Sequence, residues 1–448
     1  MVGKNILVVG QPRVGFLADG RADTPYIAAQ LIKTDDGDIE ISIPWVHGEE
    51  SHPQRDWFGA ATFVDADGPR ASSDPPDAFE FHDHNGSVVL VGCRVRTWNA
   101  VWPSGVGVGI LASDYAVLGA RGTARYSRLN GLRSQVEGLG AWVGLHSLDA
   151  EQKYSPDGRL ESASLHLKAP DSIRISKSMN LTIRPSYLYG SGEHPDETTI
   201  SERMLVETQV KNAREWRDHL AQHEAVRDLV RIAAWRRFTF QGHQATRNDD
   251  PARTLDGKAH GQLWYPVETS LTKIAAPLTI GGGPLFLFHF DDVGSRGVAR
   301  WLGLRDRMAR AIDPILSLLD LQGAPVSTHV AQLGIGLEAL GFLLALEKGV
   351  SESAAGKQHF YQRLGNIADS CCHPLPVDRS SWIKSMSNLY NGVKHANREM
   401  PEFRDLADGY WQSILVFRWW LAGRLGVKRR VLVERLTWDS VARRALPE

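Results

Sequence analysis

The segment from Ser385 to Arg398 carries the side chains of this sequence that are best suited to chemistry. If the segment is helical, it presents one polar stripe with residues at positions i, i+3, i+4 and i+7. The stripe consists of Asn391, Lys394, His395 and Arg398. It offers an amide, two cations and a histidine, a side chain that can exchange protons near neutral pH. The other side of the predicted helix is apolar and consists of Trp382, Met386, Leu389, Tyr390 and Val393.

These groups suit the cleavage of RNA without a metal ion. The ribose 2′-hydroxyl must lose a proton to attack the adjacent phosphate, and the leaving 5′-oxygen must gain one; histidine can do both. Lys394 and Arg398 can stabilise the charge on the phosphate in the transition state. Asn391 can orient the ribose or hold the tautomer of His395. A need for the 2′-hydroxyl would select RNA over DNA.

Simpler interpretations of the same residues stay open. The stripe can be a solvated helix face that happens to carry one histidine, and Asn391 and His395 can cap or bridge neighbouring helices.

A metal site elsewhere in the sequence is also considered, because His82 and His84 fall on one face of a predicted strand. The sequence offers no third ligand for them, so we expect no metal and no cofactor.

Roughly the first 210 residues are predicted to form strands. Asp36-Gly37, Asn85-Gly86 and Asp157-Gly158 are hairpin signals, and alternating apolar segments follow them. Repeated strands at this spacing predict packed antiparallel sheets. One helix is expected after these strands, from about residue 213 to 235, with Asn212 as its N-cap.

From about Gly297 the apolar residues follow a helical period, after a predicted strand at Leu285–Phe290. Five helices are expected: Val298–Leu321, broken near Pro314; Thr328–Gly349; Gln358–Cys371; Arg379 to about Arg398, capped by Asp378; and Phe403–Leu425. Five helices that are joined by short loops predict a helical bundle. The fold class is therefore α+β and multidomain, with a β-rich domain over residues 1–295 and an all-α bundle over residues 296–448.

Composition and charge narrow the class of protein. The net charge of −1 over 448 residues argues against a protein that coats nucleic acid with its whole surface. The region from Gly297 onward contains 20 Lys and Arg residues and 15 Asp and Glu residues, so it carries an excess of positive charge. This excess indicates either that the region binds a partner of its own or that the charges are distributed by chance. Three cysteines form no disulfide framework. Met1–Gly10 is not a signal peptide, and Glu338 interrupts the most apolar stretch, so we expect a cytoplasmic protein without a membrane span.

The C-terminal region resembles a HEPN domain (higher eukaryotes and prokaryotes nucleotide-binding), whose signature is Arg, four to six residues, then His, often with Asn after the Arg. The whole chain resembles the ApeA-type HEPN proteins of bacterial anti-phage defence, which join a β-rich ApeA N-terminal domain to a C-terminal HEPN domain. The N-terminal likeness rests on Leu132–Trp142, on the helix at Glu215–Trp235 and on Leu285–Phe290 with the segment that follows it. In the bundle, Gly336–Leu340 resembles the helix that faces the motif helix.

By this resemblance His395 is the signature histidine, Asn391 is the polar residue after the signature Arg, and Glu338 is a supporting polar position. The chain departs from the signature at Tyr390, which stands where Arg is expected. Lys394 or Arg398 can supply the missing charge, since both share the predicted face of His395. The alternative is a site that is weak or inactive.

The resemblance implies an endoribonuclease of abortive infection that cuts tRNA or mRNA. HEPN ribonucleases are typically dimers whose motif helices meet, so we expect at least a homodimer. The β-rich domain would sense a phage-derived trigger. Two other functions stay open: a HEPN protein that binds RNA, nucleotide or a protein partner without cleavage, and a carbohydrate-active protein, prompted by 14 Trp and the predicted sheets.

Overall fold

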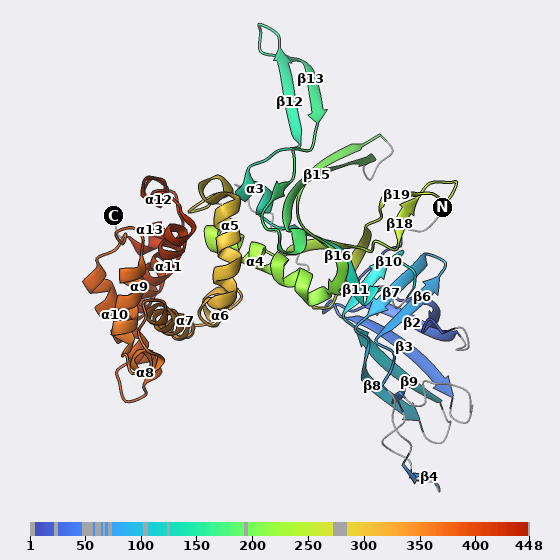
Figure 1. The fold of residues 1–448 in the computed structure, drawn as a ribbon, viewed down its shortest axis with the longest axis horizontal. Coiled ribbons are helices and arrows are strands. Elements are labelled where there is room, and N and C mark those ends of the chain that lie inside the picture. Colours follow the sequence, from blue (N-terminus) through green and yellow to red (C-terminus); the bar gives the residue numbers. More distant parts are fainter. Residues whose placement is uncertain are drawn as a thin grey trace. The chain divides into compact units, whose positions relative to one another are not determined.

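The structure is a computed structural model, and Figure 1 shows its elements along the chain. It describes residues 5–21, 26–46, 57–58, 64–65, 68–69, 74–101, 106–122, 126–191, 196–271 and 285–446. Contacts group the chain into two compact units. The first comprises Met1–Gln135, Glu207–Ala221 and Thr239–Pro277, and the second comprises Val136–Val206, Gln222–Phe238 and Leu278–Glu448. Strand β16 (Thr198–Glu215) and helix α4 (Trp216–Ala234) contribute residues to both units.

A large antiparallel sheet forms most of the first unit. The strand order is β11-β17-β20-β10-β7-β6-β1-β2-β3-β9-β8, and all neighbours from β17 to β8 pair antiparallel. The strands are β1 (Arg13–Ala18), β2 (Ile27–Lys33), β3 (Ile39–Val46), β6 (Ala78–Asp83), β7 (Gly86–Val91), β8 (Arg94–Val101), β9 (Val106–Ser113), β10 (Tyr115–Leu118), β11 (Arg128–Val136), β17 (Phe240–Thr246) and β20 (Tyr265–Thr269). Two short ladders join β4 (Val64–Asp65) to β5 (Gly68–Pro69) and β18 (Pro251–Arg253) to β19 (Ala259–Gln262). The predicted β-rich N-terminal region is confirmed.

The hairpin signals in the sequence are confirmed as turns. Gly37 separates β2 from β3 with φ +88°, and Gly86 begins β7 with φ +123°. Both angles lie in the region that glycine adopts without a steric penalty. The turn chemistry therefore fixes the register, in which β2 and β6 bury alternate residues while β7 is buried on both faces.

The end of β6 differs from the prediction that placed His82 and His84 on one strand face. Strand β6 ends at Asp83, and His84 lies in the turn. The carboxylate of Asp83 accepts two hydrogen bonds from the Arg13 guanidinium, at 2.8 and 2.6 Å. This buried pair anchors the hairpin to β1. Among the described residues, no group of three or more His, Cys, Asp or Glu side chains is placed to hold a metal ion.

The second unit begins with further β structure. Strands β14 (Ile173–Arg174) and β15 (Thr182–Ser191) pair antiparallel, and β15 neighbours β16. Helix α3 (Leu139–Val143), the 3₁₀ turn η1 (Ser178–Asn180) and a hairpin of β12 (Leu148–Tyr154) and β13 (Leu160–Leu167) lie in the same part of the chain. The predicted turn of this hairpin is confirmed, with Gly158 at φ +82°.

The C-terminal part of the second unit is all helical, as predicted. Its helices are α5 (Phe290–Arg307), α6 (Ala309–Ser317), α7 (Val326–Glu347), α8 (Glu352–Gly356), α9 (Phe360–Ser370), α10 (Arg379–Lys394), α11 (Phe403–Leu425), α12 (Arg429–Leu436) and α13 (Ala442–Ala445). Helix α11 has the predicted bounds, and the Asp378 side chain caps α10 by accepting a 2.8 Å bond from the Ser381 amide. The predicted break near Pro314 falls earlier, at Met308, while Pro314 lies inside α6.

Two predicted elements before the bundle are wrong. Asn212 does not cap a helix, because β16 continues to Glu215 and α4 starts at Trp216. The segment Leu285–Phe290 is not a strand: the Leu287 amide donates to the Ala233 carbonyl at the end of α4, and α5 begins at Phe290. A short apolar run looks alike in a strand and in a buried extended segment, so its sequence cannot tell them apart.

Helix α7 is the central helix of the bundle and packs against α6, α9, α10 and α11. Small residues allow these approaches. A Cβ added at Gly334 would lie 2.1 Å from the Tyr390 ring, and one at Gly341 would lie 2.3 Å from the Arg363 carbonyl oxygen. Among the described residues, α7 alone is long and apolar enough to cross a membrane, and half of that apolar stretch is buried inside the protein.

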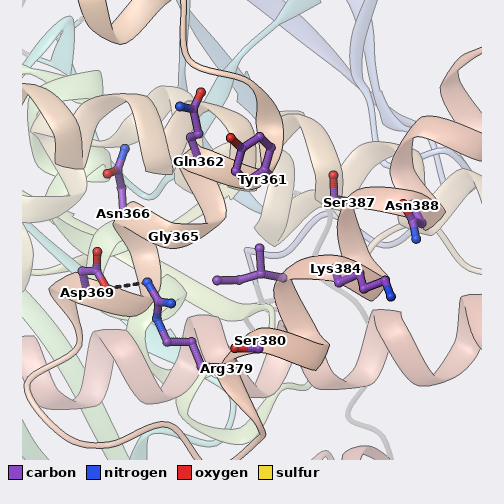
Figure 2. Close-up of a pocket in the computed structure, with 11 residues that line it drawn as sticks. Tyr361, Gln362, Gly365, Asn366, Asp369, Arg379, Ser380, Lys384, Ser387 and Asn388 are labelled. Carbon is purple, nitrogen blue, oxygen red and sulfur yellow. Dashed lines mark hydrogen bonds and ion pairs between the residues drawn. The ribbon is translucent and has the colours of Figure 1, made fainter.

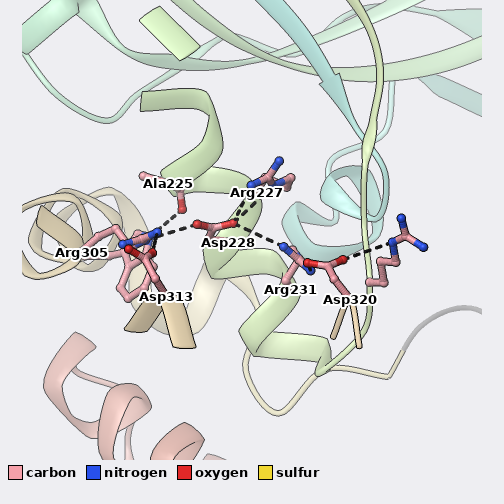
Figure 3. Close-up of polar contacts among 9 residues, drawn as sticks. Ala225, Arg227, Asp228, Arg231, Arg305, Asp313 and Asp320 are labelled. Carbon is pink, nitrogen blue, oxygen red and sulfur yellow. Dashed lines mark hydrogen bonds and ion pairs between the residues drawn. The ribbon is translucent and has the colours of Figure 1, made fainter. Parts of the chain in front are cut away.

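Charged side chains fix α4 to the helices that follow it within the second unit (Figure 3). Asp228 is buried and accepts hydrogen bonds from Arg227 at 3.0 Å and from Arg305 at 3.3 Å. Arg231, one turn along α4, donates to Asp320 at 2.7 Å. Because Asp228 and Arg305 are partnered, this polar cluster is compatible with burial.

The predicted boundary between residues 295 and 296 falls inside α5. The contacts group Leu278–Glu448 with Val136–Val206 and Gln222–Phe238, so the helical region shares its unit with earlier parts of the chain. A functional division near residue 295 remains a prediction.

Candidate functional site

The carboxylate of Glu338 on α7 is the meeting point of three helices. Arg363 of α9 donates to Oε1 at 2.9 Å, and the Tyr390 hydroxyl of α10 donates to Oε2 at 3.2 Å. The Nζ of Lys394 lies 3.9 Å from the same Oε2. The side chain of Glu338 is 31% exposed and that of Arg363 only 14%. The position that the resemblance marked as supporting therefore joins Tyr390 and Lys394, two of the predicted site residues.

Tyr390 fills the position where a cation was expected. Its ring is buried against Gly334 and packs on Phe360, with the ring centroids 4.6 Å apart. Burial, and then the Glu338 carboxylate beside it, raise the pKa of Tyr390 to about 12. The phenol is therefore a neutral hydrogen-bond donor at physiological pH.

Two cations surround this neutral donor. Lys394 lies with Nζ 5.2 Å from the centroid of the Tyr390 ring, within reach of a cation–π contact, and its side chain is 47% exposed. Arg363 is held by Glu338 and by the carbonyl of Gly356 at 3.3 Å. With one carboxylate against two cations, the cluster carries a net charge of +1. Lys394 is its solvent-facing cation.

Sequence reasoning missed Arg363. The only signal in the sequence was that Arg363 precedes Leu364 within the predicted helix Gln358–Cys371. A residue next to an apolar position of a helix is expected at the edge of the buried face. That signal gives no partner, because the contact with Glu338 joins residues 25 positions apart on different helices.

His395 lies just beyond the end of α10, and not on its continuing face. Its φ and ψ are −114° and 113°, and its amide donates to the Asn391 carbonyl at 3.1 Å. The His395 side chain is exposed and makes no hydrogen bond within the described residues. The predicted helix to about Arg398 is therefore wrong, and the stripe ends at Lys394.

The helix ends there because the chain must turn back to α11. A Cβ added at Gly392 would lie 2.8 Å from Cγ of Pro401, so Pro401 packs directly on the last turn of α10. Arg398, whose amide donates to the His395 carbonyl at 3.0 Å, is exposed in the connecting turn. Asn391 is half-buried on α10. Asn391, Lys394 and His395 thus cluster at the helix end, while Arg398 leaves the helix face.

A cavity of about 680 Å³ lies between α9 and α10 (Figure 2). Tyr361, Gln362, Gly365, Asn366 and Asp369 line it from α9, and Arg379, Ser380, Ile383, Lys384, Ser387 and Asn388 line it from α10. Arg379 donates to Asp369 at 2.8 Å across one end. On α10, Lys384, Asn388 and Asn391 are spaced i, i+4 and i+7, so the lining face runs on toward the candidate site.

The chain has a β-rich N-terminal region followed by an all-α region, and this architecture defines an α+β protein. The helical region carries the cluster of Tyr390, Glu338 and Lys394 close in sequence to the exposed His395. The family described as ApeA N-terminal domain 1 matches residues 21–301, and the chain belongs to this family. This membership indicates an ApeA-type anti-phage defence protein. The all-helical C-terminal region is consistent with the predicted HEPN domain. No curated protein and no solved structure matches the chain.

Proposed function

We propose that this protein is an endoribonuclease of bacterial anti-phage defence that cleaves RNA without a metal ion. The observation that carries the proposal is the end of α10, where the exposed His395 directly follows Lys394, the cation bound beside Glu338. Membership of the ApeA N-terminal domain family supports the defence role. Cytoplasmic RNA, tRNA or mRNA, is the proposed substrate.

Each residue of the cluster has a role in this mechanism. His395 accepts the proton of the ribose 2′-hydroxyl and returns one to the leaving 5′-oxygen, which leaves a 2′,3′-cyclic phosphate. Lys394 binds the phosphate and stabilises its charge, and Arg398, in the turn that follows His395, is the second proposed phosphate-binding cation. Asn391 orients the ribose. Glu338 and Tyr390 are positioning residues, because they hold the end of α10 and the Lys394 ammonium in place.

The proposed active form is at least a homodimer through the helical region. One copy presents a single His395, exposed at the helix end and without a hydrogen-bond partner among the described residues. A two-fold axis near this end would bring two histidines and two Lys394 side chains to one phosphate. The N-terminal region would then regulate the enzyme by responding to a phage-derived trigger.

A specific observation favours a second candidate function, RNA or nucleotide binding without cleavage. Tyr390 replaces a permanently charged side chain by a neutral phenol, and Glu338 neutralises part of the remaining positive charge. A site with weaker stabilisation of the transition state can still bind a phosphate chain. Such a protein would bind RNA tightly and show no turnover.

The test is a cleavage assay on total tRNA and mRNA in EDTA, with and without extract from phage-infected cells. The variant is His395→Ala, and the matched control is His260→Ala, which removes an exposed histidine in β19. We expect products with cyclic phosphate ends from the parent and the control, and none from His395→Ala. Equal cleavage by the parent and His395→Ala would contradict the proposal. Tight binding without cleavage, with and without extract, would favour the second candidate function.

A further inference from the structure

The cavity between α9 and α10 has the size and the walls of a ligand site. Its volume of about 680 Å³ falls in the range of small-molecule pockets, roughly 300–1,000 Å³. Figure 2 shows Gln362 and Asn366 of α9 on one side and Lys384, Ser387 and Asn388 of α10 on the other. None of these residues belongs to the Glu338 cluster.

The charged groups at the cavity favour an anion. Lys384 is exposed and forms no ion pair within the described residues. Arg379 is paired with Asp369 at 2.8 Å, and both of these side chains are 52% exposed. One carboxylate therefore stands against two cations, which leaves the Lys384 ammonium available for a phosphate.

The polar groups of α9 are held in defined orientations. The Asn366 amide donates to the Gly341 carbonyl at 3.2 Å and to Gln358 Oε1 at 2.8 Å, which leaves its Oδ1 as an acceptor. Gln362 Oε1 accepts from the His359 amide at 2.8 Å, which leaves its Nε2 as a donor. Asn366 thus contributes an acceptor and Gln362 a donor to the cavity lining, and the edge of a nucleobase carries both kinds of group.

The cavity also offers apolar surface for a flat ring. Tyr361 is 54% exposed, and Ile383 lies half-buried on the facing helix. Exposed aromatic side chains beside cations are typical of proteins that bind single-stranded nucleic acid, because each base can stack on them. A neutral peptide or a neutral carbohydrate carries no anionic group that could pair with the Lys384 ammonium.

The position of the cavity connects it to the candidate cleavage site. Lys384 lies on α10, 11 residues before His395 at the end of the helix, which is about 16 Å at the helical rise. Asn388 and Asn391 lie between them on the same helix face. A few nucleotides of an extended strand span such a distance.

We propose that this cavity holds one nucleotide of the RNA strand, with its base against Tyr361 and its phosphate on Lys384, a few nucleotides from the bond that is cut. The inference rests on the proposed function, since it identifies a subsite for the same substrate. The proposed ligand of the cavity is an RNA strand, and a free nucleotide would make only part of the same contacts.

The test measures RNA binding apart from cleavage. Full-length His395→Ala protein is titrated with a fluorescently labelled single-stranded oligoribonucleotide, and AMP and inorganic phosphate serve as competitors. The added variants are Lys384→Ala and Tyr361→Ala; the controls are Lys428→Ala and Tyr189→Ala, at exposed positions outside the cavity. We expect each cavity variant to weaken RNA binding roughly tenfold, and the controls to bind as His395→Ala does.

The outcomes separate this inference from the proposed function. RNA binding that is unchanged in both cavity variants overturns the subsite, whether or not the parent protein cleaves RNA. Weakened binding in the cavity variants supports the subsite even if the parent shows no cleavage, in which case the nuclease proposal alone fails. Competition by AMP at low concentration, with no added affinity for the oligonucleotide, overturns the RNA strand as ligand in favour of a free nucleotide.

Discussion

The Tyr390 hydroxyl donates a 3.2 Å hydrogen bond to Glu338 Oε2 and so ties the last turns of α10 to the central helix α7. At the position where the resemblance to HEPN domains predicts Arg, this chain therefore has a neutral donor that binds a carboxylate. A guanidinium still reaches that carboxylate, because Arg363 of α9 binds the other oxygen. One of the two cations of this site, Arg363, thus comes from α9, while the other, Lys394, lies on α10 itself.

Replacing Tyr390 by Phe should remove this single bond and keep the packing of the ring. We expect the free energy of unfolding to fall by about 1 kcal/mol, the usual contribution of one such bond. Urea unfolding of Tyr390→Phe, compared with Tyr189→Phe at an exposed position, measures it. Because the pKa of Tyr390 is raised to about 12, the variant should also lose the phenolate absorbance that this residue would contribute at that pH. Equal stability of the two variants would show that the bond contributes nothing.

Replacing Gly334 by Ala should separate α7 from α10. The new Cβ would lie 2.1 Å from the Tyr390 ring, which is buried and cannot move away cheaply. Overpacking of this kind costs about 1–3 kcal/mol. The matched control is Gly356→Ala in α8, where the Cβ would meet nothing within 4 Å. Thermal unfolding should show a lower midpoint for Gly334→Ala alone; a parent-like midpoint would mean that the helices are not in tight contact.

A buried ion pair on α11 should be sensitive to loss of one partner. Arg418 donates two 2.8 Å bonds to Asp439, and both side chains are almost completely buried. Asp439→Ala leaves the guanidinium charge uncompensated, which costs about 3–5 kcal/mol. Glu347→Ala removes the partner of Arg424 on the same helix, but that pair is about one-third exposed, so we expect at most about 1 kcal/mol. Chemical denaturation of both variants measures the difference, and equal losses would contradict it.

The stability of the first unit should depend on pH through His219. The carbonyl of Leu129, 3.2 Å from Nε2, can only accept, so Nε2 carries the proton and Nδ1 accepts from the Thr208 hydroxyl at 2.8 Å. Burial lowers the pKa of His219 to about 4 from its ordinary value of 6.5. As pH falls, His219 of the unfolded chain therefore binds a proton at a higher pH than His219 of the folded protein. The contribution of His219 to the free energy of unfolding is complete above pH 6.5 and is lost as pH falls toward 4.

Between pH 7 and pH 5 this site alone should remove about 2 kcal/mol from the free energy of unfolding. Urea titrations at the two pH values measure the loss. The free energy of unfolding of His219→Gln should be lower than that of the parent at pH 7, because a buried hydrogen-bonded group is replaced. Between pH 7 and pH 5, however, the variant should lose less of its free energy of unfolding than the parent does. The exposed His260→Ala should keep the full pH dependence of the parent. A parent-like pH dependence of His219→Gln would contradict this assignment.

The sequence by itself determined the elements whose signals are local. Asp-Gly and Asn-Gly turns place the hairpins, because the turn requires positive φ at glycine, as at Gly37 and Gly86. Asp378 starts α10, and the apolar period delimits α11 at Phe403–Leu425. Such signals depend on neighbours in the chain, so a single sequence contains them.

Tertiary structure alone decided where β16 gives way to α4, where α10 ends, and which charge meets Glu338. The segment around Asn212 continues as a strand of the sheet, and Pro401 packs on Gly392 and turns the chain after Lys394. Arg363 reaches Glu338 from another helix. These outcomes depend on contacts between residues distant in sequence, whose energies outweigh local helix preference, and no spacing within one segment encodes them.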